Sequence, residues 1–190
     1  MERMIAQQFA EFSHGLDFAR VPKEVIEKAK LLILDTVGIC IGSTKIDFGD
    51  AVLRLVSSWG GTPQSSVIGE AGKVPAHHAA FCNGVLGHGQ DYDDTHTESV
   101  VHPSAALVPA ALALGERDKR SGREILVALV AALETSIGLG MPALNRFHLR
   151  GFHTTSICTT FGTALMAAKT HGFELDRTVQ ALGISGSFAS

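Results

Sequence analysis

The sequence predicts an all-α protein: one helical bundle-like domain over residues 1–190. Three observations support this fold class: apolar residues recur at helical spacing, several segments carry helix-start signals, and a single short segment has strand character. The chain has 190 residues, of which 45% are hydrophobic and 18% are charged. This composition suits one folded unit with a sizeable core, and it excludes a wholly disordered chain.

The first part of the chain predicts a series of amphipathic helices, each with apolar residues at every third or fourth position. These expected helices cover residues 5–12, 25–40 and 48–59. Pro22 provides a start for the second helix, and the glycine and proline run at 60–63 ends the third. Residues 65–68 form the strand-like segment, which is short and bounded by turn residues.

The second part of the chain predicts further helices at 75–85, 103–114, 121–139, 154–171 and 176–184. Pro109 is expected to bend the helix that begins at Pro103. The helix after Ser121 has the strongest start signal, because Ser121 and Glu124 have the spacing of a capping box. The last of these helices ends without a capping or polar closing segment. We therefore expect a chain truncated at its C-terminus, with apolar surface exposed there.

Charge and composition exclude several classes of function. Lys and Arg number 16 against 19 Asp and Glu, so no overall basic field attracts nucleic acid or an anionic membrane surface. The longest apolar run, residues 125–133, is about half of what a bilayer span needs, and the N-terminus lacks the pattern of a secretory signal. Three distant cysteines indicate neither a disulfide framework nor a cysteine-ligated cluster. We expect a cytoplasmic protein without membrane or nucleic-acid partners.

Histidine and carboxylate residues are concentrated in the middle of the chain. Seven of the nine histidines lie between residues 77 and 153, and the segment 88–96 holds two histidines and three carboxylates. Carboxylates this close shift one another's proton affinity, which suits acid–base chemistry or a cation site. The segment is therefore the first candidate for a functional site.

A metal site is one interpretation of this segment. In one version, a magnesium ion that binds a diphosphate takes Asp93, Asp94 and Glu98 as ligands. In another, a hydrolase site takes the ligands His88, Asp91, His96 and His102. The chain lacks the second acidic cluster and the aromatic content that a helical magnesium enzyme of this kind needs, with only 6% aromatic residues.

A second interpretation is structural. Asp93, Asp94 or Thr95 then caps the following helix, and the histidines lie on the surface. This explains any one residue but not the density of the whole segment. The third interpretation is acid–base catalysis, for which the wider pattern of motifs provides the argument.

The motifs occur in a fixed order along the chain. They are Asn83-Gly84, His88, Asp91-Tyr92-Asp93-Asp94-Thr95, His102-Pro103-Ser104, Ser121-Gly122 with Glu134, and Gly151-Phe152-His153-Thr154-Thr155. In order and approximate spacing this series resembles the MmgE/PrpD family, whose members include 2-methylcitrate dehydratase, cis-aconitate decarboxylase and iminodisuccinate epimerase. The resemblance implies a largely helical fold with an α/β lid domain and further active-site residues beyond residue 190.

The resemblance also implies a function. Family reactions can be written through a carbanion-like state beside a carboxylate, so the expected protein is a cofactor-independent lyase or isomerase with no metal, acting on a small di- or tricarboxylate. A 2-methylcitrate dehydratase of propionate metabolism is the leading expectation, and a homodimer is expected. Dehydration, decarboxylation and epimerisation are not separated by the residues. A magnesium-dependent helical enzyme and a noncatalytic dimerisation module remain the alternatives.

His153 is the first candidate for proton transfer. It lies at the expected start of a helix, where amide donors and the positive end of the helix dipole favour a carboxylate and lower the pKa of an imidazole. By the resemblance, the motif residues Asp91, Thr95 and His102 also line the site. The expected catalytic residues are His153, His102 and Asp91, where Asp91 orients a histidine. The expected substrate-binding residues are Thr95, as a donor to a carboxylate, His88 and Arg150.

Overall fold

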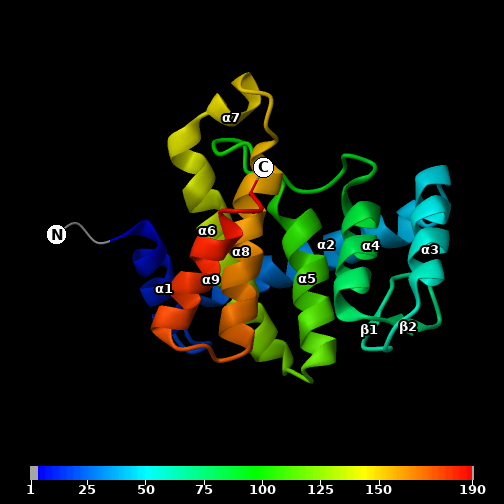
Figure 1. Ribbon diagram of the computed structural model, residues 1–190, viewed down its shortest axis with the longest axis horizontal. Helices are drawn as coiled ribbons and strands as arrows, with labels where there is room; N and C mark the ends of the chain where they lie inside the picture. Colours follow the sequence, from blue (N-terminus) through cyan, green and yellow to red (C-terminus); the bar gives the residue numbers. More distant parts are fainter. Residues whose placement is uncertain (1–3, 190) are drawn as a thin grey trace.

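A computed structural model describes residues 4–189 and shows the expected all-α architecture (Figure 1). Within that part of the chain there are nine α-helices, one short 3-10 helix and one two-stranded sheet. The elements are α1 (Ile5–Gly15), α2 (Lys23–Ser43), α3 (Asp47–Trp59), β1 (Ser65–Ser66), β2 (Lys73–Val74), α4 (Ala76–His88), α5 (Pro103–Arg117), α6 (Gly122–Gly140), η1 (Met141–Ala143), α7 (Arg146–Leu149), α8 (Thr154–Thr170) and α9 (Leu175–Ser185). The prediction of a helical bundle-like domain is confirmed.

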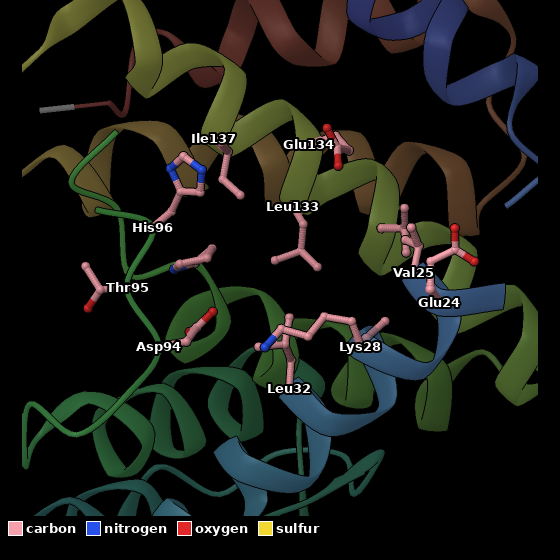
Figure 2. Close-up of a pocket in the computed structure, with 13 residues that line it drawn as sticks. Glu24, Val25, Lys28, Leu32, Asp94, Thr95, His96, Leu133, Glu134 and Ile137 are labelled. Carbon is pink, nitrogen blue, oxygen red and sulfur yellow. The ribbon is translucent and has the colours of Figure 1, made fainter. Parts of the chain in front are cut away.

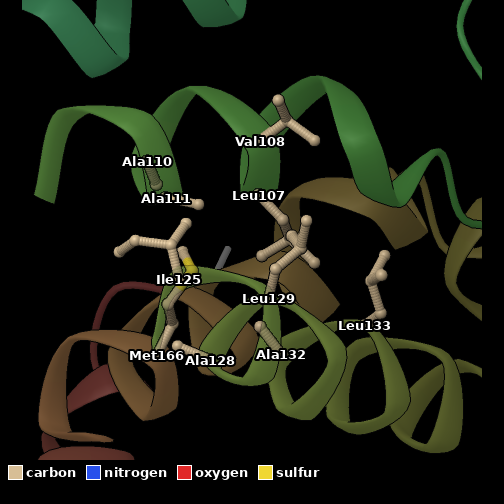
Figure 3. Close-up of a cluster of buried hydrophobic side chains, with 10 residues drawn as sticks. All are labelled: Leu107, Val108, Ala110, Ala111, Ile125, Ala128, Leu129, Ala132, Leu133 and Met166. Carbon is tan, nitrogen blue, oxygen red and sulfur yellow. The ribbon is translucent and has the colours of Figure 1, made fainter. Parts of the chain in front are cut away.

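Helices α5, α6 and α8 form the centre of the fold, and their apolar side chains interlock between the helix axes (Figure 3). The buried residues of this core are Leu107, Val108, Ala110, Ala111, Ile125, Ala128, Leu129, Ala132, Leu133 and Met166. The capping box at the start of α6 is present: the Ser121 hydroxyl accepts from the Glu124 amide, and the Glu124 carboxylate accepts from the Ser121 amide. The helix with the strongest predicted start, at Ser121, is therefore the central helix α6.

Helix α6 is apolar around most of its circumference because other helices cover it. It belongs to a stretch, Gly122–Ala143, that is long and apolar enough to cross a membrane, with a mean hydropathy of 1.8. However, 67% of that window is buried inside the fold, where α6 contacts α5, α8, α2 and α1. Its composition is thus that of a core helix, which has apolar neighbours on nearly all sides.

Helices α6 and α8 pack closely where Gly162 of α8 faces α6. A Cβ atom at this position would lie 2.8 Å from the Ala132 carbonyl oxygen and would overlap the Ser136 hydroxyl. Both contacts belong to the rigid core, so a larger residue can be accommodated only by moving one helix. The close approach of the two helices therefore depends on a glycine here.

Gly162→Ala is expected to destabilise the protein by about 1–3 kcal/mol through overpacking. Gly183→Ala provides the matched control: it lies within α9, where a Cβ meets no atom within 4 Å, and alanine there favours the helix by up to about 1 kcal/mol. Thermal unfolding of both variants measures the difference. Equal melting temperatures for the two variants would contradict the packing described for α6 and α8.

The sheet is smaller than the sequence pattern indicates. The expected strand at 65–68 is reduced to Ser65–Ser66, and it pairs antiparallel with Lys73–Val74, a partner that the sequence did not reveal. Asn83 of α4 fixes the hairpin, since its side chain accepts from the Ile68 amide and donates to the Ser66 carbonyl. These local hydrogen bonds stabilise the short strands without an extended ladder.

The helix prediction was incomplete elsewhere. The short elements η1 and α7 between α6 and α8 were not predicted. Pro109 lies inside α5, which extends from Pro103 to Arg117, and the bend expected there stays a prediction. The expected apolar surface near the C-terminus is present, with Ile184 and Phe188 exposed. All other expected helices appear within a few residues of their predicted bounds.

The cysteines are free and buried, as the sequence indicates. Burial raises the pKa of the Cys40 thiol to about 12, and that of the Cys82 and Cys158 thiols to about 11. Thiols with such pKa values stay protonated near neutral pH, so these residues act as small apolar groups in the core.

Candidate active site

Several helix ends meet at one end of the molecule. The loop between α4 and α5 extends towards α7 and the start of α8, and all of these segments lie on the same side of the core in Figure 1. His88 is the last residue of α4, His102 precedes α5, and His153 precedes α8. The three histidines are far apart in sequence, and the fold brings their rings to within 5.4–6.3 Å of one another, measured between centroids.

Asp93 connects two of these histidines. Its side chain is only 1% exposed, and both carboxylate oxygens lie 3.0 Å from Nδ1 of His88. Since an ionised carboxylate only accepts hydrogen bonds, Nδ1 of His88 carries the proton. The same carboxylate lies 3.7 Å from Nδ1 of His102 and favours a proton there too. Asp93 thereby leaves Nε2 of both rings free to accept a proton.

His102 is also held from other directions. Thr155, in the first turn of α8, accepts a hydrogen bond from the His102 amide at 2.9 Å. The Thr95 hydroxyl lies 3.2 Å from Nδ1 of the His102 ring, and it can accept the proton that Asp93 favours on that nitrogen. Thr95 then keeps its own hydroxyl proton for a second partner. The side chain of His102 is 19% exposed, so the ring is largely fixed in place.

His153 occupies the N-cap position of α8, as the sequence predicted. Desolvation by the surrounding protein lowers its pKa, and the nearby rings of His148, His88 and His102 lower it further, whereas Asp91 opposes the shift. Clustered imidazoles repel one another when charged, so a proton on His153 is held weakly. The ring is neutral at pH 7 and can exchange a proton readily.

The pKa of His153 is expected to lie below the ordinary histidine value of 6.5. Titration of the ring protons by NMR measures it directly. The variant His148→Asn removes a neighbouring charge whose ring lies 5.5 Å away, so it should raise the pKa of His153. A His153 pKa at or above 6.5 in the unmodified protein, or no upward change in the variant, would contradict the described electrostatics.

Asp91 lies at the start of the loop, where its amide donates to the His88 carbonyl and closes the turn after α4. Its backbone has a φ of 54°, a left-handed conformation that aspartate tolerates better than most residues. One carboxylate oxygen and ligand atoms of His88, Asp93 and His102 all lie within 4.8 Å of one another. The structure therefore brings Asp91 into the cluster, and its role there remains a prediction.

Arg150, the remaining predicted substrate-binding residue, lies apart from the hydrogen bonds of the cluster. It follows α7, is exposed, and lines a hollow of about 700 Å³. The other residues that line this hollow are Arg146, Phe147, Leu149, Phe152, Ile157 and Ala189. Two residues separate Arg150 from His153 in sequence, and a contact of Arg150 with a substrate at His153 stays a prediction.

The magnesium hypothesis fails on geometry. Asp94 lies beside Asp93 in sequence, but Asp94 lines a different hollow of about 400 Å³, which Thr95 and His96 also line (Figure 2). There Asp94 accepts from the Ser104 amide, and burial raises its pKa. Glu98 is exposed and outside the ligand cluster found among the described residues. The three carboxylates therefore do not converge on one ion.

Only part of the second set of candidate metal ligands converges. His88, Asp91 and His102 do converge, but His96 does not, because its Nδ1 atom lies 2.9 Å from the Ser99 hydroxyl within the loop. Asp93 takes the place of His96 in the cluster. No sequence pattern favoured Asp93 over His96, since the direction of a side chain in an irregular loop follows no simple period.

Other residues of the site were missed by sequence reasoning or given no role. Asp93 was expected as a metal ligand, a cap or part of a motif, Thr155 only as part of a motif, and His148 was given no role. His148 is exposed on α7, and its Nδ1 atom lies 3.2 Å from the Thr154 hydroxyl. The one available signal was the density of histidines, which includes His148 but does not place it.

Together, the fold and the cluster define a helical domain with a histidine–carboxylate centre suited to acid–base chemistry. A sequence profile of the MmgE/PrpD N-terminal domain matches residues 7–190. The chain therefore belongs to the MmgE/PrpD family, and the resemblance seen in its motifs is confirmed.

Curated relatives identify a related enzyme class. The chain is 31% identical to the cis-aconitate decarboxylase of Homo sapiens and 30% identical to that of Mus musculus, in both cases over 100% of this chain and 40% of the relative. The cis-aconitate decarboxylase of Aspergillus terreus is 25% identical over 95% of this chain and 38% of the relative. The chain thus spans about two fifths of the length of these relatives, which are lyases.

Proposed function

We propose that this chain is the helical part of a cofactor-independent lyase that decarboxylates a small tricarboxylate of the cis-aconitate type. The observation that carries the proposal is the convergence of His88, His102 and His153, with the buried Asp93 between two of the rings. The names of the curated relatives favour decarboxylation over the dehydration that the sequence led us to expect.

Helix ends support a negatively charged substrate at this place. The N-termini of α5 and α8 both border the cluster, through His102 and His153. At α5 the Ser104 amide already donates to Asp94 and Pro103 has no amide proton, so the start of α8 is the helix end that can receive a substrate carboxylate. The hydroxyl of Thr95, beside His102, adds a donor of the kind that a substrate carboxylate accepts. A tricarboxylate has enough acceptors to engage the start of α8 and this hydroxyl together.

The reaction needs a proton and a place for developing charge. When the bond to the departing carboxylate breaks, carbon dioxide leaves and the electron pair stays on a carbon framework conjugated with a second carboxylate. His153 in its charged form delivers a proton to that carbon and regains one from water. The N-terminus of α8 and the Thr95 hydroxyl stabilise the transient negative charge. The overall change consumes one proton and releases one carbon dioxide.

The lowered pKa of His153 gives the pH dependence a direction that distinguishes the reactions. If charged His153 donates the proton, kcat/KM falls as the pH rises through the folded-state pKa, which lies below 6.5. In dehydration or epimerisation, the neutral ring abstracts a proton, and kcat/KM falls as the pH drops through the same value. Decarboxylation therefore predicts higher activity on the acidic side.

The test uses the protein with its full natural chain, treated with a chelator and then supplied in turn with cis-aconitate, 2-methylcitrate and iminodisuccinate. Mass spectrometry of the products is expected to show loss of carbon dioxide from cis-aconitate. Dehydration of 2-methylcitrate or epimerisation of iminodisuccinate would overturn the proposed reaction but keep the chemistry beside a carboxylate. No conversion of any of the three would overturn the proposal.

A further inference from the structure

The cluster has a second property that proton transfer does not require: its ligand atoms lie at distances suited to a metal ion. Atoms of His88, Asp91, Asp93 and His102 are all within 4.8 Å of one another. The carboxylate of Asp93 lies 3.0 Å from Nδ1 of His88 and 3.7 Å from Nδ1 of His102. Around a tetrahedral zinc ion with ligands at about 2.0–2.1 Å, neighbouring ligand atoms are about 3.3 Å apart.

We propose that His88, Asp91, Asp93 and His102 bind one divalent transition-metal ion of the zinc type, and that this ion inhibits the enzyme. Two imidazoles with two carboxylates favour zinc, cobalt or nickel over magnesium or calcium, which prefer oxygen ligands alone. Asp91 is exposed and the side chain of His88 is 43% exposed, so an ion reaches the cluster from solvent. The ion is an inhibitor and not a cofactor of the proposed reaction.

Inhibition follows from the nitrogen that the ion uses. In the metal-free protein Asp93 favours a proton on Nδ1 of His88 and His102, which leaves Nε2 with a lone pair. A metal ion beside Asp93 takes the Nδ1 lone pairs, so the neutral rings must carry their proton on Nε2. The ion thereby reverses the tautomer of both rings and adds positive charge near His153. His102 can then no longer accept a proton at Nε2.

The site has a testable spectroscopic property that does not depend on turnover. The full natural chain, freed of metal with a chelator and exchanged into clean buffer, is titrated with Co²⁺, whose visible absorption reports its coordination. Nitrogen-15 NMR of the histidine rings, with Zn²⁺ added in place of Co²⁺, reports the tautomers. Because the inhibitory effect rests on the proposed function, turnover of cis-aconitate with and without Zn²⁺ is measured separately.

The variants Asp93→Asn and His88→Asn remove one ligand each, while His77→Asn removes an exposed histidine of α4 outside the cluster and serves as the matched control. Circular dichroism checks that each variant is folded. We expect one Co²⁺ per chain for the unmodified protein and His77→Asn, and an affinity at least about tenfold lower for the two ligand variants. Zn²⁺ should move the ring protons to Nε2 and abolish turnover, and a chelator should restore it.

Equal Co²⁺ affinity in all folded variants, or ring tautomers that Zn²⁺ leaves unchanged, would overturn the inference. Metal binding at the cluster without loss of turnover would overturn its inhibitory part. A protein that needs the metal for turnover would overturn both this inference and the metal-free function. A fourth outcome separates the two proposals. If Co²⁺ binds more weakly to the two ligand variants and Zn²⁺ changes the ring tautomers, but cis-aconitate is not converted, the metal site is supported and only the proposed function fails.

Discussion

Replacing His153 by glutamine is expected to lower kcat by about 10²–10⁴-fold, the usual contribution of a positioned acid or base. Glutamine keeps a polar side chain of similar reach but cannot exchange a proton near neutral pH. The ring of His153 lies at the N-terminus of α8 and 6.0–6.3 Å from the rings of His88 and His102, measured between centroids. The substitution therefore removes an imidazole from the centre of the site. Steady-state kinetics with cis-aconitate measures it.

A matched control variant shows whether replacing a histidine outside the site has the same effect on kcat. His77 is exposed on α4 and outside the cluster, so His77→Gln should retain the activity of the unmodified protein. Circular dichroism and thermal unfolding confirm that both variants are folded. A folded His153→Gln variant with unchanged kcat would remove this residue from the proposed mechanism.

The second large effect is expected from Asp93→Asn. A buried carboxylate that fixes a histidine tautomer can be worth about 10⁴-fold in kcat when it is replaced by an amide, as known for the aspartate of serine-protease triads. In this protein Asp93 holds Nδ1 of His88 at 3.0 Å and faces Nδ1 of His102 at 3.7 Å. We expect a fall in kcat of about 10²–10⁴-fold with a smaller change in KM.

Asp94→Asn is the matched control for this variant. Asp94 is the next residue and is also shielded from solvent, but it accepts from the Ser104 amide and faces a different hollow. The asparagine keeps an oxygen for that hydrogen bond, so kcat should change little. Nitrogen-15 NMR should show that the proton of the His88 ring loses its preference for Nδ1 only in Asp93→Asn. Equal kinetics in the two variants, or unchanged tautomers, would contradict a positioning role for Asp93.

The helical framework was predictable because its signals are local and repeated. The periodic apolar residues of α2 and α6, the prolines at the starts of α2 and α5, and the capping box at Ser121 all act within a few residues. The same signals placed His153 at the start of α8. The short elements β2, η1 and α7 have only two, three and four residues, too few to show a periodic pattern, so the sequence did not reveal them.

The residues of the site were predictable from the sequence, but the contacts that they make with one another were not. The density of histidines and carboxylates, with the ordered motifs, selected His88, Asp91, Thr95, His102 and His153, and the structure places all of them at one end of the fold. The direction of each carboxylate was not predictable. The segment 89–102 is mostly irregular, and tertiary contacts decide which of its consecutive side chains points inwards.

The division of roles among the consecutive aspartates illustrates this limit. The sequence suggested that Asp91 orients a histidine, and the structure shows that Asp93 makes the contact with His88. Asp94 instead accepts from an amide at the start of α5. Among three similar carboxylates within four positions, Asp91 and Asp93 thus join the histidine cluster and Asp94 does not, a division that only the folded chain reveals.

Metal-free proton transfer beside a carboxylate is the central claim, and proton NMR in heavy water tests it most directly. The full natural chain, with chelator present, is mixed with cis-aconitate, and the spectrum of the product is recorded over time. We predict a decarboxylated product that carries one solvent deuterium on carbon, formed at a rate that falls by about 10²–10⁴-fold in His153→Gln. Turnover that begins only when a divalent metal ion is restored would contradict the claim.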